Sequence, residues 1–437
     1  MYKHVRWNAT IWCAVLMAAT FLWLAVLDHL GLWHVIGVMA TQPHFLDWHG
    51  VVAASDCAKL GYNVFLQNPC DAFQRLHNYG TIWLNVGRLG LTRENQSWTG
   101  LVISVSFIVA SSLALRPKSI KQCVIAFLAL ASPAVTLGIE RANVDLIIFM
   151  VLLVATFLIA RPQGLAKWTG AALCLLLTVA KLYPAVAFAS IFWALPSRRR
   201  VLFTFTGFAA AVIAWGLFNL TEVTTVIGIF ERPGLGPTHG GEFLGPTHGG
   251  SLLYVVLIFQ QFIPSTLDPV RAGLITFILT YLVSLFCARY VHFNDRADAL
   301  DRVRLIAGSA IAAFAFGVTT NYDYRNIFLL FTLPFLIKLH QDGQRQDALP
   351  RLVIFSTLTL MIFVLWANAL VTGTAMAAGW LHAGPGATQS IVLAGFLAKH
   401  LAHWFLVFLF MLLGNALLFR QWSALAAWVP KGLPHTT

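Results

Sequence analysis

The sequence predicts an all-α polytopic membrane protein, and three observations lead to this prediction. Hydrophobic residues fill 58% of the 437 positions and charged residues only 11%, too few to cover a soluble domain of this length. Apolar stretches near the ~20 residues needed to cross a bilayer recur along the whole chain. Short basic clusters separate these stretches, as topology determinants do. We expect a single transmembrane domain spanning 1–437, with roughly 10–13 transmembrane or re-entrant helices.

The apolar stretches give the expected spans in chain order. The first lacks a clear small-residue cleavage site, so we expect a retained helix and not a removed signal peptide. The stretch 168–195 is too long for one span, and Tyr183-Pro184 interrupts it beside Lys181, so two shorter helices meeting at a bend are expected. The stretch 251–263 is too short to cross and should lie partly in the interface. The remaining spans are expected at 10–30, 99–116, 119–137, 143–160, 201–219, 270–290, 303–318, 326–340, 351–372 and 391–419.

The distribution of Lys and Arg sets the expected orientation. If the N-terminus is cytoplasmic and 168–195 goes in and returns, most basic residues fall on the cytoplasmic side, including the Arg198–Arg200 run. Both termini are then cytoplasmic. The net charge of +12 is spread over these short clusters, which does not favour a nucleic-acid partner. The 15 Trp and 33 Phe suit interfacial belts and lipid contact.

This topology gathers the unusual polar segments on the non-cytoplasmic face and predicts a functional site there. Cys57 and Cys70 share the first long loop and could form a disulfide if that loop faces an oxidising compartment. The other four cysteines lie in or beside apolar spans and are expected to be packing residues. The polar segments are the loop 39–98, Glu140–Asp145, the bend at Lys181, the loop 220–250 and Asn321–Arg325.

Asp47 is the candidate general base. It follows the first span, where a partly dry setting can tune a carboxylate for proton transfer; an ordinary loop aspartate or helix cap is the alternative. His49 and Arg75 lie in the same loop and are candidates for contacting a substrate.

A second group of candidates opens an apolar helix, where charges are costly if they enter hydrocarbon. Arg141 and Asp145 are spaced i,i+4 and could pair. With Glu140 and Asn143 they form either an interfacial cap with a salt bridge or a hydrogen-bonding wall for a polar substrate.

Lys181 and the segment around Arg325 are candidate phosphate sites. Lys181 could extend to the membrane surface or, beside the break at Tyr183, hold a phosphate. Arg325 could recognise a phosphate while Tyr322 and Tyr324 line a sugar or lipid groove; a simple polar turn is the alternative.

The loop 220–250 contains a duplication, Leu-Gly-Pro-Thr-His-Gly-Gly at 235–241 and again at 244–250. Its glycines and prolines predict irregular backbone. His239 and His248 lack the carboxylate or thiol partners of a zinc site, so neither a metal nor another cofactor is expected. The loop is either a flexible lid that reaches a phosphate or sugar, or a tolerated surface repeat.

Taken in order, these residues resemble the membrane glycosyltransferases of the GT-C fold, especially family 87, the polyprenol-phosphate-mannose-dependent mannosyltransferases. The resemblance covers the first half of the chain. The matching elements are Asp47, Gly61-Tyr62-Asn63-Val64-Phe65, Arg141-Ala142-Asn143-Val144-Asp145 and Lys181-Leu182-Tyr183-Pro184.

The resemblance implies a GT-C-like bundle in the cell envelope, in the inner (plasma) membrane of a bacterium. It implies inverting transfer of a mannose-like hexose from a polyprenyl-phosphate donor to a lipid-linked or glycan acceptor at the outer face. Asp47 would be the base, and Glu140, Asn143 and Asp145 would orient sugar hydroxyls. The phosphate would be held by Lys181, Arg325, Arg75 and His239. Alternative functions are a ligase or polymerase of polysaccharide that uses lipid-linked sugar, a lipid or solute transporter, and a structural membrane subunit.

Overall fold

The fold is helical, as the sequence predicts. The computed structural model describes residues 2–195, 198–221, 224–225, 269–293, 297–318, 323–342, 347–380 and 384–427, and these contain helices and no strand. Six of the described helices are long and apolar enough to cross a membrane, and a pair bent by 56° adds a seventh if it is counted as one span. The prediction of an all-α polytopic membrane protein is confirmed.

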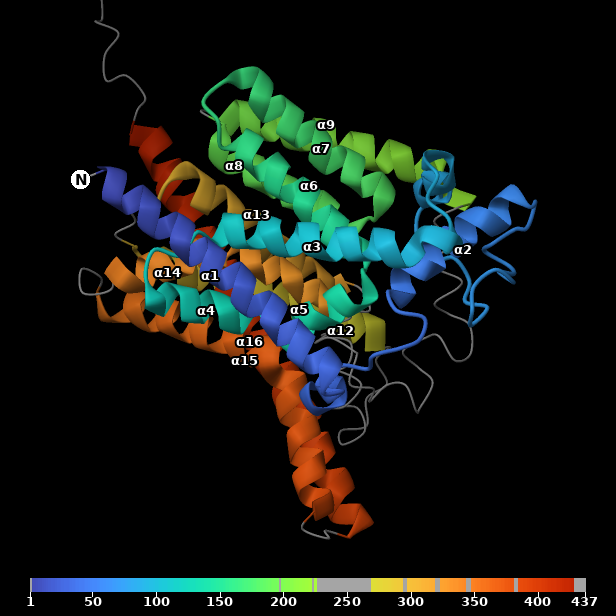
Figure 1. The fold of residues 1–437 in the computed structure, drawn as a ribbon. Helices are drawn as coiled ribbons and strands as arrows, with labels where there is room; N and C mark the ends of the chain where they lie inside the picture. The colour runs from blue at the N-terminus through green and yellow to red at the C-terminus, as the bar shows by residue number, and fades with distance from the viewer. Residues whose placement is uncertain are drawn as a thin grey trace, which may run out of the picture.

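Most described elements overlap the expected spans and run roughly side by side, but 119–137 is split into α4 and α5, and α15 and α16 are longer than expected (Figure 1). The expected interfacial segment 251–263 lies outside the described residues. The bounds of the N-terminal elements are α1 Tyr2–His29, η1 Leu32–Ile36, α2 Leu46–Lys59, η2 Thr81–Leu89, η3 Arg93–Asn95, α3 Gln96–Leu115, α4 Ile120–Leu130, α5 Pro133–Arg141, α6 Val144–Ile159, α7 Gly164–Ala180, η4 Tyr183–Ser190 and α8 Ile191–Ala194. The remaining elements are α9 Arg198–Phe218, α12 Pro269–Cys287, η5 Ala288–Tyr290, α13 Ala299–Val318, η6 Asp323–Phe331, α14 Leu333–Gln341, α15 Ala348–Trp380 and α16 Pro385–Ala427.

The expected hairpin in 168–195 is confirmed. The helix α7 ends at Ala180, Lys181 is extended (φ −157°, ψ 140°), and η4 begins at Tyr183. Lys167, near the start of α7, donates to the carbonyl oxygen of Ala194 at the end of α8, over 2.8 Å. The two arms therefore return to the same level, and Lys181 lies at the tip.

The chain also breaks between α5 and α6. Ala142 adopts a left-handed conformation (φ 41°), and the amide of Asn143 donates to the carbonyl oxygen of Gly138. This is a Schellman-type helix end. The break makes the predicted Arg141–Asp145 pair wrong, because the two residues belong to different helices and no longer share a helix face.

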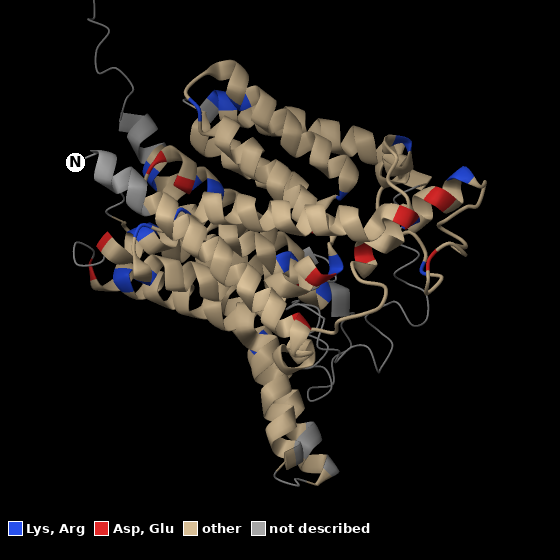
Figure 2. Cartoon of the chain, in the orientation of Figure 1, with Lys and Arg blue, Asp and Glu red and all other residues tan. Residues whose placement is uncertain are grey.

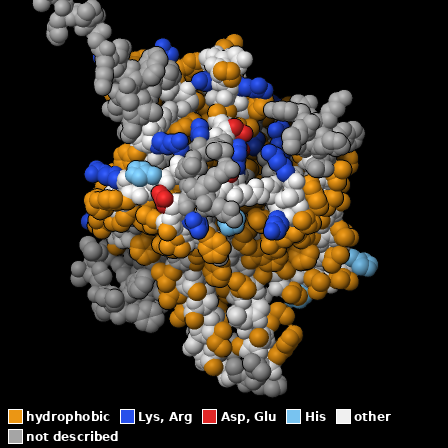
Figure 3. Space-filling model, turned by 90° about the vertical axis from the view of Figure 1, so that its left-hand side faces the viewer, with side chains coloured by type: hydrophobic (Ala, Val, Ile, Leu, Met, Phe, Trp, Pro, Cys, Tyr) orange, Lys and Arg blue, Asp and Glu red, His pale blue; other side chains and the backbone are white. Residues whose placement is uncertain are grey.

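Basic residues gather at the end of the bundle that carries the N-terminus of α1, and mixed charges gather at the α2 end (Figure 2). A view onto the basic end shows Lys and Arg side chains across it and hydrophobic side chains around the sides (Figure 3). An ion pair and a hydrogen bond cross this end: Lys338 lies 3.6 Å from Asp301, and Arg304 donates to the carbonyl oxygen of Ala114. Charge is thus concentrated at the two ends of an apolar body, as a bilayer favours.

The first long loop folds into a cap over the α2 end. The cap consists of α2, η2 and η3 with their connections, and a disulfide joins Cys57 to Cys70. The Trp83 indole donates to the carbonyl oxygen of Ala180 over 3.0 Å, which fixes η2 against the tip of the α7–η4 hairpin. Trp48 and Val144 pack into the same apolar cluster. The cap therefore lies directly on the chain breaks at Ala142 and Lys181.

Candidate functional site

Asp47 lies in the first turn of α2, with its side chain 13% exposed. Its Oδ2 accepts a hydrogen bond from the side-chain amide of Asn143 over 2.6 Å. Its Oδ1 lies 3.6 Å from an Arg75 nitrogen and 3.7 Å from an Arg141 nitrogen. One oxygen is therefore fixed by an amide while two guanidinium groups flank the other.

Arg75 is itself held in place by the cap. It forms an ion pair with Asp71 at 2.8 Å and donates to the carbonyl oxygen of Leu46 over 2.7 Å. Burial works to raise the pKa of Asp71, but the hydrogen bonds and charge of Arg75 outweigh burial and hold that pKa below its ordinary value. Arg75 is thus preorganised beside Asp47.

Glu140 and Arg141 lie on the side of the Asp47 cluster that faces the segment after η1. Arg141 pairs with Glu140 at 3.0 Å and donates to the carbonyl oxygen of Met39. The other Glu140 oxygen accepts from the amide of Thr41 over 3.0 Å. These contacts tie the segment after η1 to the end of α5.

The Lys181 ammonium lies among the rings of Tyr79, Tyr183 and Tyr324, and we call this group the Lys181 basket. The ammonium lies 2.5 Å from Asp145 and 5.0 Å from the centre of the Tyr79 ring. The rings of Tyr183 and Tyr324 lie at 5.6 Å and 5.8 Å, distances at which a cation interacts favourably with an aromatic face. The elements that meet here are the cap, α6, the hairpin tip and η6.

Arg325 adds a second positive charge to this basket, since its guanidinium lies 5.3 Å from the centre of the Tyr183 ring. Two buried polar atoms nearby, Asp145 Oδ2 and the Tyr183 hydroxyl, have no partner with good hydrogen-bond geometry among the described residues. Such buried polar atoms are uncommon in folded proteins, and a water molecule, an ion or a polar ligand can satisfy them.

Tyr79 joins the Asp47 pocket to the Lys181 basket. Burial raises the pKa of its phenol well above the ordinary value, and the nearby charges of Asp47 and Asp145 raise it further. The charges of Arg75 and Arg325 act in the opposite direction. The Tyr79 phenol therefore lies within electrostatic range of charged groups from both halves.

His49 lies apart from this site. It follows Asp47 by two positions on α2, and residues two apart on a helix point in different directions. Its ring is buried, contacts the side chain of Gln96 and accepts a hydrogen bond from the amide of Ala72. The predicted candidates His239, His248 and Tyr322 lie outside the described residues.

The structure therefore brings together residues from four of the five polar segments singled out in the sequence, and the fifth, 220–250, falls almost wholly outside the described part of the chain. Among the described residues no group of three or more His, Cys, Asp and Glu side chains is arranged to hold a metal ion.

A buried ion pair was missed in the sequence. Lys399 of α16 is 1% exposed, and its ammonium lies 2.8 Å from Asp323 and 2.6 Å from the side-chain oxygen of Asn368. The available signal was a lone lysine inside an otherwise uncharged span, the kind of residue that membrane helices seldom carry without a role. Tyr79 was missed as well, because nothing in its loop sequence distinguishes it from neighbouring aromatic residues.

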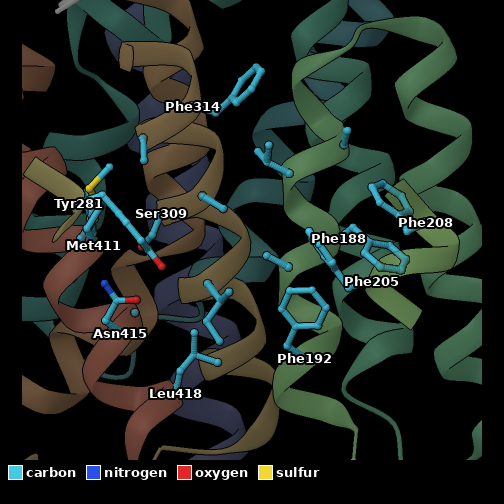
Figure 4. Close-up of a pocket in the computed structure, with 18 of the residues that line it drawn as sticks. Phe188, Phe192, Phe205, Phe208, Tyr281, Ser309, Phe314, Met411, Asn415 and Leu418 are labelled. Carbon is cyan, nitrogen blue, oxygen red and sulfur yellow. The ribbon is translucent and has the colours of Figure 1, made fainter. Parts of the chain in front are cut away.

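An apolar cavity of about 490 Å³ opens beside the hairpin that carries Lys181. Phenylalanines of η4, α8 and α9 form one side of it, and α12, α13 and α16 form the other (Figure 4). The cavity begins at Ala185, two residues after Tyr183, and extends toward Leu418 near the basic end. Its length runs along the membrane-spanning direction of the bundle.

No family model matches the chain, and no match was found among curated proteins or solved structures.

Proposed function

We propose that the chain is a membrane glycosyltransferase that moves a mannose-like hexose from a polyprenyl-phosphate donor to a lipid-linked or glycan acceptor. The observation that carries the proposal is the shared cluster of polar side chains. In it a carboxylate, Asp47, lies near a lysine framed by three tyrosines, and Ala185 of the hairpin that carries this lysine lines an apolar cavity. A lipid-borne sugar phosphate needs these three parts: a base, an anion site and room for an apolar chain.

Asp47 acts as the base in the proposed reaction. It accepts the proton of an acceptor hydroxyl as that oxygen attacks the anomeric carbon. The bond from this carbon to the phosphate oxygen breaks on the opposite face, so the configuration inverts and polyprenyl phosphate leaves. Asp47 afterwards loses the proton to water. Asn143, Arg75 and Arg141 hold the carboxylate in place for this step.

Lys181 and Arg325 stabilise the negative charge that develops on the departing phosphate. The phosphate is a stable anion, so no general acid is required. Tyrosine rings suit the apolar faces of a hexose, and Asp145 Oδ2 and the Tyr183 hydroxyl offer partners for sugar hydroxyls.

The apolar cavity provides a place for the isoprenoid chain. It begins two residues from Tyr183, and the phenylalanines on one side of it offer aromatic surface to an unsaturated chain. Burial of apolar surface contributes about 25 cal/mol per Å², so the chain would supply much of the donor's binding free energy. This fits a donor that diffuses in the bilayer.

The proposed location is the inner membrane of a bacterium, with the site on the outer face and both termini in the cytoplasm. The concentration of Lys and Arg at the opposite end supports this orientation. The Cys57–Cys70 disulfide in the cap supports it too, because such bonds persist outside the cytoplasm.

A transporter of lipid or solute is the second candidate. The helices break at Ala142 and at Lys181, and charged side chains meet at both breaks, as in the discontinuous helices of transporters. Flux of a polyprenyl-phosphate sugar across proteoliposomes without transfer to an acceptor would favour this candidate over the enzyme.

Turnover of a polyprenyl-phosphate mannose by the purified protein tests the enzyme proposal. Asp47→Asn should lower kcat by about 10²–10⁴-fold, because the amide cannot accept the proton, while donor affinity changes little. Asp56→Asn is the matched control, since Asp56 lies on the same helix and pairs with Arg93 away from the pocket. Equal kcat for Asp47→Asn and the wild type would remove Asp47 from the mechanism.

A further inference from the structure

Lys399 lies in α16, far from the pocket in sequence, yet its partner Asp323 is the first residue of η6. The next two residues of η6 are Tyr324 and Arg325, which belong to the Lys181 basket. Any contact that fixes Asp323 therefore fixes the backbone from which these two side chains extend.

Asn368 of α15 completes the contact. Its side-chain oxygen accepts from Lys399 over 2.6 Å, and its nitrogen donates to the same Asp323 oxygen that Lys399 contacts. All three side chains are almost fully buried. Two donors, Asn368 of α15 and Lys399 of α16, therefore bind the Asp323 carboxylate at the start of η6.

The same junction reaches the segment after η1. Gly37 packs so closely on α15 that an added Cβ would lie 2.9 Å from the carbonyl oxygen of Asn368, and its φ of +75° also favours glycine. Two to four residues later, Met39 and Thr41 bind Arg141 and Glu140 on the other side of the pocket. One junction therefore adjoins two of the chain segments that border the site.

Stability alone gives little reason for an ion pair here. Two charges lose most of their hydration in such a place, and replacing a buried pair with apolar side chains is often neutral or stabilising. A directional contact, by contrast, fixes the geometry of the groups it joins, and a phosphate site depends on that geometry.

We propose that Lys399 is a positioning residue. With Asn368 it holds Asp323, and thereby sets the place of Tyr324 and Arg325 at the donor phosphate. The role at the phosphate rests on the proposed function; the hold on η6 does not. The α15–α16 pair then sets the geometry of the site in addition to spanning the membrane.

Lys399→Met tests this role in lipid nanodiscs by two readouts. The first is hydrogen–deuterium exchange of the η6 backbone, which should become about tenfold faster as the junction loosens. The second is steady-state kinetics with a polyprenyl-phosphate mannose. The donor KM should rise about tenfold, and kcat per folded molecule should fall as well, because Arg325 stabilises the charge that develops on the departing phosphate.

Trp404→Phe is the matched control. It removes a hydrogen bond of 3.0 Å from α16 to Thr280 and leaves the junction intact. It should leave both η6 exchange and the donor KM at the wild-type level. If Lys399→Met loses only folded protein, with η6 exchange and KM equal to those of the control, the positioning role is overturned.

Two further comparisons keep the outcomes separate. If Lys399→Met does not fold, the neutral pair Asp323→Asn with Lys399→Met replaces it, and η6 exchange should still rise because methionine cannot donate. If the wild type transfers no sugar, the proposed function fails, and exchange in η6 alone then decides whether Lys399 holds this segment.

Discussion

Asn143 uses both atoms of its side-chain amide. The oxygen accepts from the amide of Asp145 and caps α6, and the nitrogen donates to Asp47. Asn143 therefore caps the start of α6, directly after the chain break that follows α5, and also orients the Asp47 carboxylate. Local folding and site geometry are coupled here, and substitutions can separate them.

Asn143→Ser should separate the two roles. Serine caps helices well, but its hydroxyl is too short to reach Asp47. Turnover should fall about 10–100-fold, the value of a hydrogen bond to a charged group, with little loss of thermal stability. Asn143→Ala should lose the same turnover and about 1 kcal/mol of stability in addition. A serine variant with wild-type turnover would show that the contact with Asp47 is not needed.

At the residue scale the sequence singled out most of the charged residues that cluster in the candidate site, but not all of their partners. Asp47 and Lys181 stood out because charges beside apolar spans are costly. The pairing of Arg141 with Asp145 was wrong because their i,i+4 spacing assumes an unbroken helix, and the left-handed Ala142 interrupts it. Lys399 went unnoticed because its partner lies 76 residues away and only the folded helices bring them together.

Among the elements, the cap is expected to have a pH-dependent stability, because it buries the ring of His77. This ring packs edge-on against Phe65 and Tyr79 between the disulfide and η2. Burial lowers the pKa of His77 from 6.5 to about 4, and the carbonyl oxygen of Gly80 only partly offsets this effect. The folded cap therefore keeps the ring neutral at a pH where the unfolded loop would bind a proton.

The cap should accordingly lose stability on acidification. Between pH 6.5 and 4 the unfolded state binds the proton and the folded state does not, so folding weakens by roughly 1.4 kcal/mol per pH unit in that window. Thermal unfolding of the wild type and His77→Phe, followed by intrinsic fluorescence, measures this. The wild-type Tm should fall more steeply than that of the variant below pH 6.5, and parallel curves would contradict the assignment.

The positions of most helices could be predicted from the sequence, because the length of an apolar stretch and the presence of a proline determine local helix structure. The hairpin at 168–195 follows from the length of the apolar stretch and from Pro184, and the structure has it. The sequence did not predict how far α15 and α16 continue beyond the expected 351–372 and 391–419. No Asp, Glu, Lys or Arg occurs between Arg351 and Lys399, so composition supplies no signal for where these helices leave the bundle.

For the whole molecule, the separation of charge between two ends links the fold to the site. The apolar body carries its charged side chains mainly at its ends, so segments distant in sequence meet where the cap covers the helix breaks. The sequence predicted this gathering from topology. The tyrosine basket and its distances arise only from packing, and no local pattern encodes them.

The affinity of the protein for a polyprenyl monophosphate tests most directly whether this gathering forms a donor site. Lys181→Met should weaken binding about 10–100-fold, because the phosphate loses a charged hydrogen-bond donor. Lys167→Met is the control at the other end of the same helix, and it should bind as the wild type does. The double variant Asp145→Asn with Lys181→Met avoids an unpaired buried carboxylate and should bind weakly as well. Wild-type affinity in both Lys181 variants would contradict a donor site at this pocket.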